Sequence, residues 1–429
     1  MTEQELTDLL HEHASAHAVP GAVVGVLRDG MATVACYGVA DASTGAPVTP
    51  ESRFGAGSLT KSMTATVIAR LAETGRLSMD DPVAARVPEL AGVNWAERAT
   101  IRDLLASRSG LPLRADLEFG FAAHEGDDDE ALARFVARIA SEAPTSIAWS
   151  YSNAGWCVLG RAIEIVTGDS WEDAMRAQLF APAGMGETSF ATEGASALRV
   201  SGHEPAAVGP VPVEPLVVRA LAPCGTSAES TAGDLLRFAA VHLGDPALAV
   251  LRSAQPSPRI HGWFDGWCLG WARFEWDGGC AWGWDSVLPG ERAFLRLVPE
   301  RDAAVVLMTN SENGRSLARS LLPGLVSSLF GRGVPALRLD AATGAAGELA
   351  RFEGTYAWPD RVVEVTATPA TLVVEEEGNE VEALPIDEQT FLVDAEHPDT
   401  PTITFGDFDA AGRPRALYFA LWGLPRVDG

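Results

Sequence analysis

The sequence predicts an α+β protein in which helices flank an antiparallel sheet, a helical subdomain adjoins it, and a small antiparallel β domain follows. Strand-like runs occur near the N-terminus and return after about residue 267, with helical spacing between them. Strands at both ends of a section with helices between them favour one antiparallel sheet assembled from two distant parts of the chain. Beyond about residue 348, short alternating segments separated by turns indicate a second, β-rich unit.

The first section is predicted from its periodicity and its turn residues. Asp29 and Gly30 separate the first two strand-like runs, and this pair favours a tight hairpin turn. Gly75 ends the long helical pattern that follows. In chain order, we predict a helix over 3–16, strands over 22–27 and 31–39, and helices over 58–74, 101–106, 130–139, 154–166 and 231–242.

The rest of the sheet and the β domain are predicted in the same way. We expect strands over 268–276, 292–298 and 303–309, and then a helix over 316–330. The alternating segments of the last part are 361–374, 380–384, 390–393, 402–408 and 415–421. An Ala/Gly-rich stretch separates the two parts. We therefore predict domains over 1–338 and 349–429, with a linker over 339–348.

Composition argues against several classes of function. The chain has 429 residues, 47% of them hydrophobic, and a formal net charge of −26. Such a chain can build a sizeable core, but it disfavours contact with nucleic-acid phosphates and with anionic membranes. We therefore expect a small-molecule or peptide acyl substrate as the partner, with no nucleic acid and no membrane.

Targeting and cofactor signals are not found in the sequence. The first residues are acidic and polar, without the basic start and apolar run of a secretory peptide, so we expect a cytoplasmic protein. The five cysteines are scattered and form no CxxC pair, which predicts free thiols. The N-terminal histidines lack the HExxH pattern of a zinc helix. We expect neither a metal ion nor a cofactor.

Lysine occurs once in this sequence. Of 32 basic residues, only Lys61 is a lysine, and the other 31 are arginines. A compositional bias of the genome is one explanation. Arginine, however, stays protonated in proteins, whereas lysine can lose its proton and act as a base. Lys61 is therefore the first candidate for a chemical role.

Ser58 lies three residues before Lys61, at the predicted start of a helix. Positions i and i+3 share a helix face, so the amine can reach the hydroxyl. A serine hydroxyl becomes a nucleophile when a base takes its proton, and a desolvated lysine can be that base. The alternative interpretation is a capping serine with an exposed lysine.

Tyr151 and Asn153 form a second candidate element, just before the helix predicted over 154–166. A phenol beside an ammonium group can have its pKa lowered and can pass a proton to a leaving group. Asn153 offers a donor and an acceptor for a substrate amide or for the lysine. The alternative interpretation is a loop tyrosine with Asn153 capping the helix.

Together these elements resemble a known family. Gly57-Ser58-x-x-Lys61, with Tyr151-x-Asn153 downstream, resembles the serine β-lactamase and penicillin-binding-protein superfamily, and most closely its class-C and family-VIII-esterase (peptidase S12-like) branch. The stretches 76–83, 104–111 and 225–235 also look like that branch. The likeness covers most of residues 5–330 and implies a β-lactamase/transpeptidase-like domain with its site between sheet and helices. It implies an acyl-enzyme on Ser58, with Lys61 and Tyr151 as the acid–base pair.

The third element of the family departs from its pattern. Where relatives have Lys-Thr-Gly or His-x-Gly on the strand beside the site, this chain has Trp284-Asp285-Ser286. Indole can neither bind a carboxylate nor move a proton, which argues against β-lactamase or carboxypeptidase activity. By the resemblance, the backbone N–H groups of Ser58 and Val287 would form the oxyanion hole, and Trp284 and Ser286 would face the substrate.

The remaining candidates are aromatic side chains and one arginine. Six tryptophans fall between residues 263 and 284, and as a group they predict an aromatic wall for an apolar acyl group. The chain also looks like penicillin-binding-protein-type thioesterases, which carry a similar lipocalin-like C-terminal β domain. In these a basic residue of that domain can meet the substrate, and Arg426 is the candidate here. Surface exposure is the alternative for Arg426.

Three functions stay open on the sequence alone. The first is a cytosolic serine hydrolase or acyltransferase, an esterase or peptidase that acts on an ester, thioester or amide. The second is a thioesterase that releases and macrocyclises nonribosomal peptides, with a carrier-bound or carrier-mimic substrate. The third, from another class, is an inactive scaffold that binds a ligand; the altered third element supports it, and the intact Ser58, Lys61, Tyr151 and Asn153 oppose it.

Overall fold

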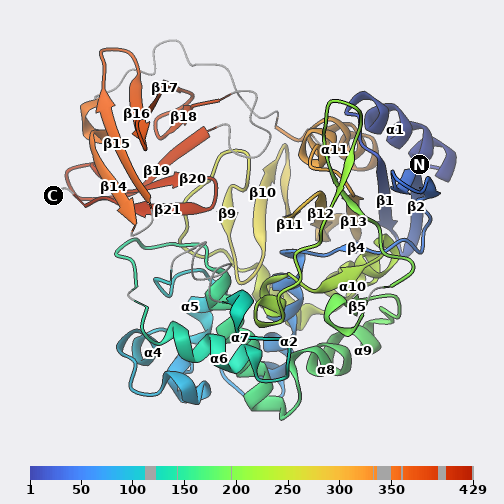
Figure 1. The fold of residues 1–429 in the computed structure, drawn as a ribbon, viewed down its shortest axis with the longest axis horizontal. Coiled ribbons are helices and arrows are strands. Elements are labelled where there is room, and N and C mark those ends of the chain that lie inside the picture. Colours follow the sequence, from blue (N-terminus) through green and yellow to red (C-terminus); the bar gives the residue numbers. More distant parts are fainter. Residues whose placement is uncertain are drawn as a thin grey trace.

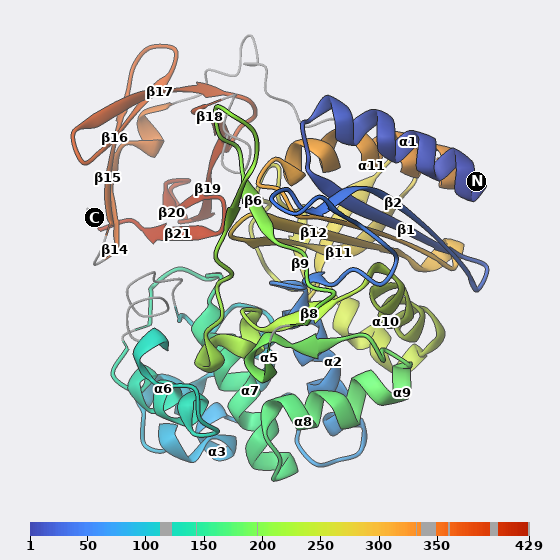
Figure 2. The same ribbon diagram turned by 45° about the vertical axis from the view of Figure 1, so that its right-hand side comes forward.

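The computed structural model describes residues 1–111, 122–142, 144–194, 196–331, 333–335, 349–358, 361–394 and 402–427. It has a larger body of sheet and helices and a β-rich body formed by the last strands, which lie side by side in both views (Figures 1 and 2). The fold consists of an antiparallel sheet covered by helices and a barrel-like antiparallel sheet at the C-terminal end. The predicted linker over 339–348 lies outside the described residues.

The main sheet joins the two ends of the first section, as predicted. Its order is β3-β2-β1-β13-β12-β11-β10-β9, and Ala22 of β1 pairs with Thr309 of β13 in antiparallel register. Its strands are β1 (Gly21–Arg28), β2 (Met31–Asp41), β3 (Ala46–Pro47), β9 (Gly266–Trp267), β10 (Ala272–Trp276), β11 (Gly279–Leu288), β12 (Glu291–Val298) and β13 (Ala303–Thr309).

Helices cover both faces of this sheet. On one face α1 (Glu3–Ala16) and α11 (Gly314–Phe330) pack together over an apolar layer that includes Leu10, Phe294 and Leu321. The other face meets α10 and the helical subdomain, which share the largest apolar cluster. The helices on this side are α2 (Leu59–Glu73), α3 (Val83–Arg86), α4 (Asn94–Arg98), α5 (Ile101–Leu105), α6 (Ala131–Ile139), α7 (Asn153–Thr167), α8 (Trp171–Met175), α9 (Ala181–Ala183) and α10 (Ala232–Gly244).

Short strands and 3₁₀ turns connect these layers. β8 (Ala228–Ser230) pairs with β4 (Phe54–Gly55) and with β5 (Ser189–Phe190). Of these strands, β4 is the one that lies just before α2 in the chain. The hairpin of β6 (Gly202–Glu204) and β7 (Val211–Val213) stands apart from them.

The C-terminal part is an eight-stranded antiparallel sheet that curls into a nearly closed barrel. Its first and last strands approach each other through a bridge between Tyr356 and Arg426. Inward side chains such as Phe352, Phe391 and Phe405 form its own apolar core. Its strands are β14 (Gly354–Trp358), β15 (Arg361–Ala367), β16 (Leu372–Glu376), β17 (Asn379–Pro385), β18 (Thr390–Leu392), β19 (Thr402–Phe408), β20 (Pro414–Phe419) and β21 (Trp422–Pro425).

Two predicted strands were wrong in their extent. The segment 268–276 is broken by a tight turn, in which Cys268 N–H donates to Trp271 O at 2.7 Å and Gly270 has a positive φ of 85°. The segment 361–374 is two strands, β15 and β16, separated by a turn closed by Thr368 and Thr371. Both turns lie inside runs of apolar or alternating residues, and the periodicity of hydrophobic residues does not reveal a turn within such a run.

Within the described residues, no helix combines the length and the apolar character that crossing a membrane requires.

Candidate active site

Ser58 stands at the N-terminal end of α2, and Lys61 follows one turn later. Gly57 enters the helix with a positive φ of 49°, a conformation that suits glycine. The Lys61 side chain is buried, and its Nζ donates to Ser58 Oγ at 3.0 Å and to the carbonyl oxygen of Cys224 at 2.5 Å. The Ser58 side chain makes no capping hydrogen bond. The alternative of a capping serine with an exposed lysine is therefore wrong.

Tyr151 completes a cluster of three side chains around one oxygen. Its hydroxyl donates to Ser58 Oγ at 3.1 Å, and Lys61 Nζ lies 5.0 Å from the centre of its ring. Burial raises the pKa of the Tyr151 phenol, and this outweighs the opposing effect of Lys61. The expected lowering is thus wrong in direction, and Tyr151 is held as a neutral phenol that can donate a proton.

Asn153 is the first residue of α7, but it is not the cap of that helix. Ser152 takes this role, because its hydroxyl accepts from Gly155 N–H at 3.1 Å. The capping interpretation of Asn153 is therefore wrong. Asn153 is half-buried, two residues after Tyr151 on the same segment.

The third element, Trp284-Asp285-Ser286, lies on β11. Because successive side chains of a strand point to opposite faces of the sheet, Asp285 points away from Trp284 and Ser286. Ser286 faces α2, where its buried Oγ accepts a hydrogen bond from the backbone N–H of Ser58 at 3.1 Å. A Cβ at Gly57 would lie 1.9 Å from that oxygen, so the hydroxyl uses the space that this glycine leaves. One of the two N–H groups expected in the oxyanion hole is therefore covered by a side-chain hydroxyl. Val287 is 40% exposed at the strand edge.

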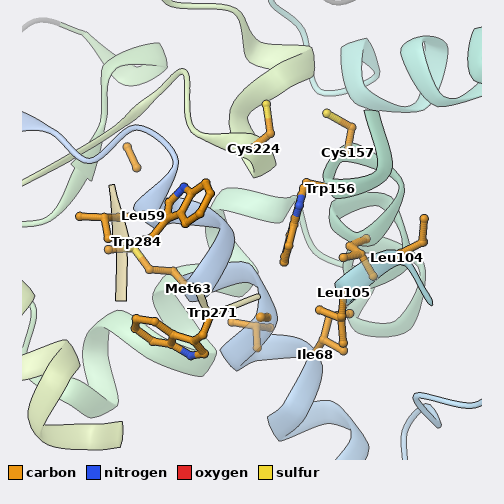
Figure 3. Packing of buried hydrophobic residues seen from close by; sticks show 14 of the residues in the cluster. Leu59, Met63, Ile68, Leu104, Leu105, Trp156, Cys157, Cys224, Trp271 and Trp284 are labelled. Carbon is orange, nitrogen blue, oxygen red and sulfur yellow. The ribbon is translucent and has the colours of Figure 1, made fainter. Parts of the chain in front are cut away.

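Trp284 packs directly on the catalytic candidates. Its ring stacks on Tyr151 at 5.6 Å with an interplanar angle of 24°, and Trp267 meets it edge-on at 4.8 Å. Figure 3 shows Trp284 beside Leu59 and Met63 of α2. Trp284 is only 1% exposed, so it fills the place of the usual cation and is not an open wall.

The six tryptophans do not form a single wall. Trp276 belongs to the apolar layer under α1 and α11, on the other face of the sheet from Trp284. Trp263, Trp267 and Trp284 gather beside Tyr151, whereas alternation along a strand sends Trp276 to the other face. That this group binds an apolar acyl group stays a prediction.

Arg426 lies in the barrel seam. Its guanidinium donates to the carbonyl oxygens of Arg351 and Glu353, and its carbon lies 5.8 Å from the centre of the Tyr356 ring. These contacts bind the last strand to the first part of the barrel. The structure thus brings Ser58, Lys61, Tyr151, Trp284 and Ser286 together and gives Arg426 contacts within its own domain.

One contributor was missed because it acts through its backbone. The sequence predicts only a free thiol for Cys224, yet its carbonyl oxygen accepts a hydrogen bond from Lys61. Gly225 follows with a φ of 127°, and a Cβ there would lie 2.2 Å from Gly57 O. A glycine at this place was the available signal, since only glycine permits two backbone segments to approach so closely.

Comparison with known proteins identifies the family. A family model described as Beta-lactamase matches residues 6–324. The chain belongs to the beta-lactamase family. This membership makes it a serine hydrolase in its general class.

Three relatives are informative. Penicillin-binding protein 4 of Amycolatopsis lactamdurans is 32% identical over 376 residues, covering 82% of this chain and 96% of that protein. SurE superposes with a TM-score of 0.82 at 28% identity over 99% of both chains, and a structure of SurE with D-Leu gives 0.79 at 27% identity over the same shares. Unguisins hydrolase ungD of Aspergillus violaceofuscus is 26% identical over 47% of this chain and 36% of that protein.

Proposed function

We propose that this protein is a serine hydrolase that forms an acyl-enzyme on Ser58 with an ester, thioester or amide substrate. The convergence of Lys61 Nζ and Tyr151 Oη on Ser58 Oγ, at 3.0 and 3.1 Å, carries this proposal. A nucleophile that touches both a base and an acid has the geometry that covalent catalysis requires.

The steps follow from these contacts. The 3.0 Å contact lets the Ser58 hydroxyl donate to the neutral amine of Lys61, which takes the proton as Oγ attacks the acyl carbon. When the bond to the leaving group breaks, Tyr151 gives that group its proton and regains one from Lys61. A water molecule or an amine then attacks the acyl carbon, passes a proton back through Lys61 or Tyr151, and releases Ser58.

The oxyanion that forms during these steps is stabilised by Ser286 and Val287. Within the described residues, no acceptor is found for the hydroxyl proton of Ser286, while its oxygen accepts from Ser58 N–H. That proton can point toward a substrate oxygen, and the hydrogen bond from the amide strengthens the hydroxyl as a donor. Ser286 therefore replaces a backbone donor in this role.

The substrate is an amino-acid-derived acyl compound with no carboxylate next to the scissile bond. Trp284 occupies the place where relatives carry a cation, so the site offers no lysine or histidine there for a carboxylate next to the scissile bond. The similarity to a protein named a hydrolase and to SurE, whose structure with D-Leu superposes on the chain, supports an acyl group derived from an amino acid or peptide.

A fluorophosphonate probe and a p-nitrophenyl ester of a D-amino acid test this proposal. We expect wild type to be labelled and to release p-nitrophenol, and Ser58→Ala to do neither. Equal labelling of Ser58→Ala contradicts the assignment. If no covalent adduct forms with any activated ester in intact-mass spectra, the scaffold is a binding protein.

The second candidate is a thioesterase that macrocyclises peptides. The C-terminal domain meets the segment that carries Tyr151, because Tyr418 donates to Trp149 O at 3.1 Å and Ala148 N–H donates to Asp407 at 3.1 Å. This contact supports a substrate long enough to reach both domains, and Arg426 would hold its far end. A peptide thioester mimic decides between the two: cyclic product supports this candidate, and linear acid alone opposes it.

A further inference from the structure

A second polar centre lies behind the sheet, on the face of β11 opposite Ser58. Asp285 follows Trp284 and points toward α11, where its Oδ2 accepts from Arg315 Nη1 at 3.0 Å. Arg296 Nη1 lies 2.6 Å from Oδ1, a close charge contact that is not aligned as a hydrogen bond. All three side chains are less than 10% exposed. Buried charges of this kind require mutual pairing, and here one carboxylate contacts two guanidinium groups.

A cavity of about 550 Å³ opens over this centre. This volume is within the range of small-molecule sites. It lies between α11 and the loop 259–265, and residues of β10, β11 and β12 also line it. Its lining includes Arg259, Trp263, Phe274, Arg296, Arg315 and Arg319.

The charge of the lining is opposite to that of the whole chain. Four arginines and three carboxylates line the cavity, whereas the protein carries a net charge of −26. The overall field repels anions, so this local excess of positive charge serves short-range recognition and not long-range attraction. Arg319 follows Arg315 by one turn of α11, which puts both guanidinium groups on the same side of the cavity.

The walls are aromatic and hold the arginines flat. The guanidinium carbon of Arg315 lies 4.0 Å from the centre of the Trp263 ring, and that of Arg296 lies 3.6 Å from the centre of Phe274. A guanidinium is a planar fork of N–H groups that fits a carboxylate, and Arg296 and Arg315 each turn part of this fork toward Asp285. The rings beside these arginines provide an apolar surface for a flat body.

We propose that this cavity is a binding site for an organic carboxylate with a flat apolar body, separate from the Ser58 centre. Binding at this site requires no acyl transfer, so the proposed site and the proposed function can be tested independently. Its wall is also a wall of the catalytic centre, because Trp263 lies 6.4 Å from Trp284, which stacks on Tyr151. A bound carboxylate is either a distal part of the substrate or a separate small molecule.

Titration calorimetry of the full chain with 2-naphthoate tests the proposal. We expect one site per chain and at least tenfold weaker binding by Arg319→Gln, since the variant loses charge-assisted hydrogen bonds to the carboxylate. Arg319→Lys keeps the charge and loses the fork, so it should bind with intermediate affinity. Neutral 2-naphthamide should bind at least tenfold more weakly than the carboxylate. Arg413→Gln, an equal change of charge on the barrel surface, should bind 2-naphthoate like wild type.

Several results would overturn this site. One is the absence of 2-naphthoate binding, and another is equal affinity for 2-naphthamide. The third is an Arg319→Gln variant that binds 2-naphthoate like wild type with an unchanged melting temperature. The fourth is loss of 2-naphthoate binding when a fluorophosphonate blocks Ser58. Ser58→Ala should bind 2-naphthoate unchanged even where it has no ester activity. If 2-naphthoate competes with the p-nitrophenyl ester, the carboxylate belongs to the substrate. If 2-naphthoate changes only the kcat of ester hydrolysis, the carboxylate belongs to a separate molecule.

Discussion

Two buried groups of basic side chains flank β11, and they differ in the atoms that these side chains contact. On the α2 side, the amine of Lys61 donates to a hydroxyl and a backbone carbonyl. On the α11 side, Asp285 pairs with both Arg296 and Arg315. A guanidinium cannot lose its proton, so burying it calls for a carboxylate. Lys61 contacts a hydroxyl oxygen and a carbonyl oxygen, which are neutral, and it can lose a proton without breaking the ion pairs of Asp285. The difference explains why one centre can do acid–base chemistry and the other can only bind.

Lys61→Arg tests this difference most strongly. It keeps a positive charge at the same position and removes the only lysine, so acylation of Ser58 should fall by about 10³-fold. Stopped-flow release of p-nitrophenol gives the rate, and circular dichroism checks that the fold is kept. Acylation at the wild-type rate would mean that the amine is not the base.

Asp285→Asn tests the other centre. Removing the carboxylate leaves two guanidinium groups buried without it, and the free energy of unfolding should fall by about 3–5 kcal/mol. Urea denaturation measures this loss. Asp80→Asn, which removes an exposed partner of Arg102, is the control and should leave the free energy of unfolding almost unchanged. A loss below about 1 kcal/mol for Asp285→Asn would show that the arginines do not depend on this carboxylate.

Ser286→Ala sharpens the comparison on the catalytic side, because Ser286 and Asp285 are neighbours on opposite faces. Loss of one oxyanion donor should lower acylation by about 10²-fold with little change in KM. The ratio of rates for an ester and its thionoester should fall as well, since sulfur accepts hydrogen bonds weakly. Ser311→Ala, which removes another buried hydroxyl, should change neither quantity. If Ser286→Ala acylates faster than wild type, the hydroxyl obstructs Ser58 N–H and is not a donor.

Local signals predicted much of this fold from the sequence. The helix over 3–16 is observed with the same bounds, because Thr2 and Glu5 form a capping box at its start. The strand over 303–309 is likewise observed as predicted. The break at Gly270 was not predictable, since it depends on distant contacts such as the hydrogen bond to Leu105 O.

The site was predictable in its residue types and not in its electrostatics. The spacing of Ser58 and Lys61 and the resemblance indicated which side chains meet. The direction of the Tyr151 pKa shift depends on how completely the ring is covered, including by Trp284 from another part of the chain. Asp285 and Arg315 become partners only when β11 and α11 pack together, so the cavity above them had no local signal.

The last prediction concerns another buried base, His242, which packs against the helix that carries Lys61, and its effect per pH unit is the smallest of those expected. His242 bonds Thr66 Oγ1 at 2.9 Å, and burial lowers its pKa to about 3 from an ordinary value of 6.5. Between pH 6.5 and about pH 3, His242 is protonated in the unfolded chain and neutral in the folded chain. The free energy of unfolding therefore falls as the pH is lowered through this range. The slope is at most about 1.4 kcal/mol per pH unit.

His242→Gln should remove this slope, measured as urea unfolding free energies at several pH values between 7 and 4. His11→Gln, a change at an exposed histidine, is the control and should keep the wild-type slope. An unchanged slope in His242→Gln would mean that other groups carry the acid sensitivity. If the slope is lost, burial beside α2 is shown to keep a base neutral. That is the condition under which Lys61, on the same helix, can take the proton of Ser58.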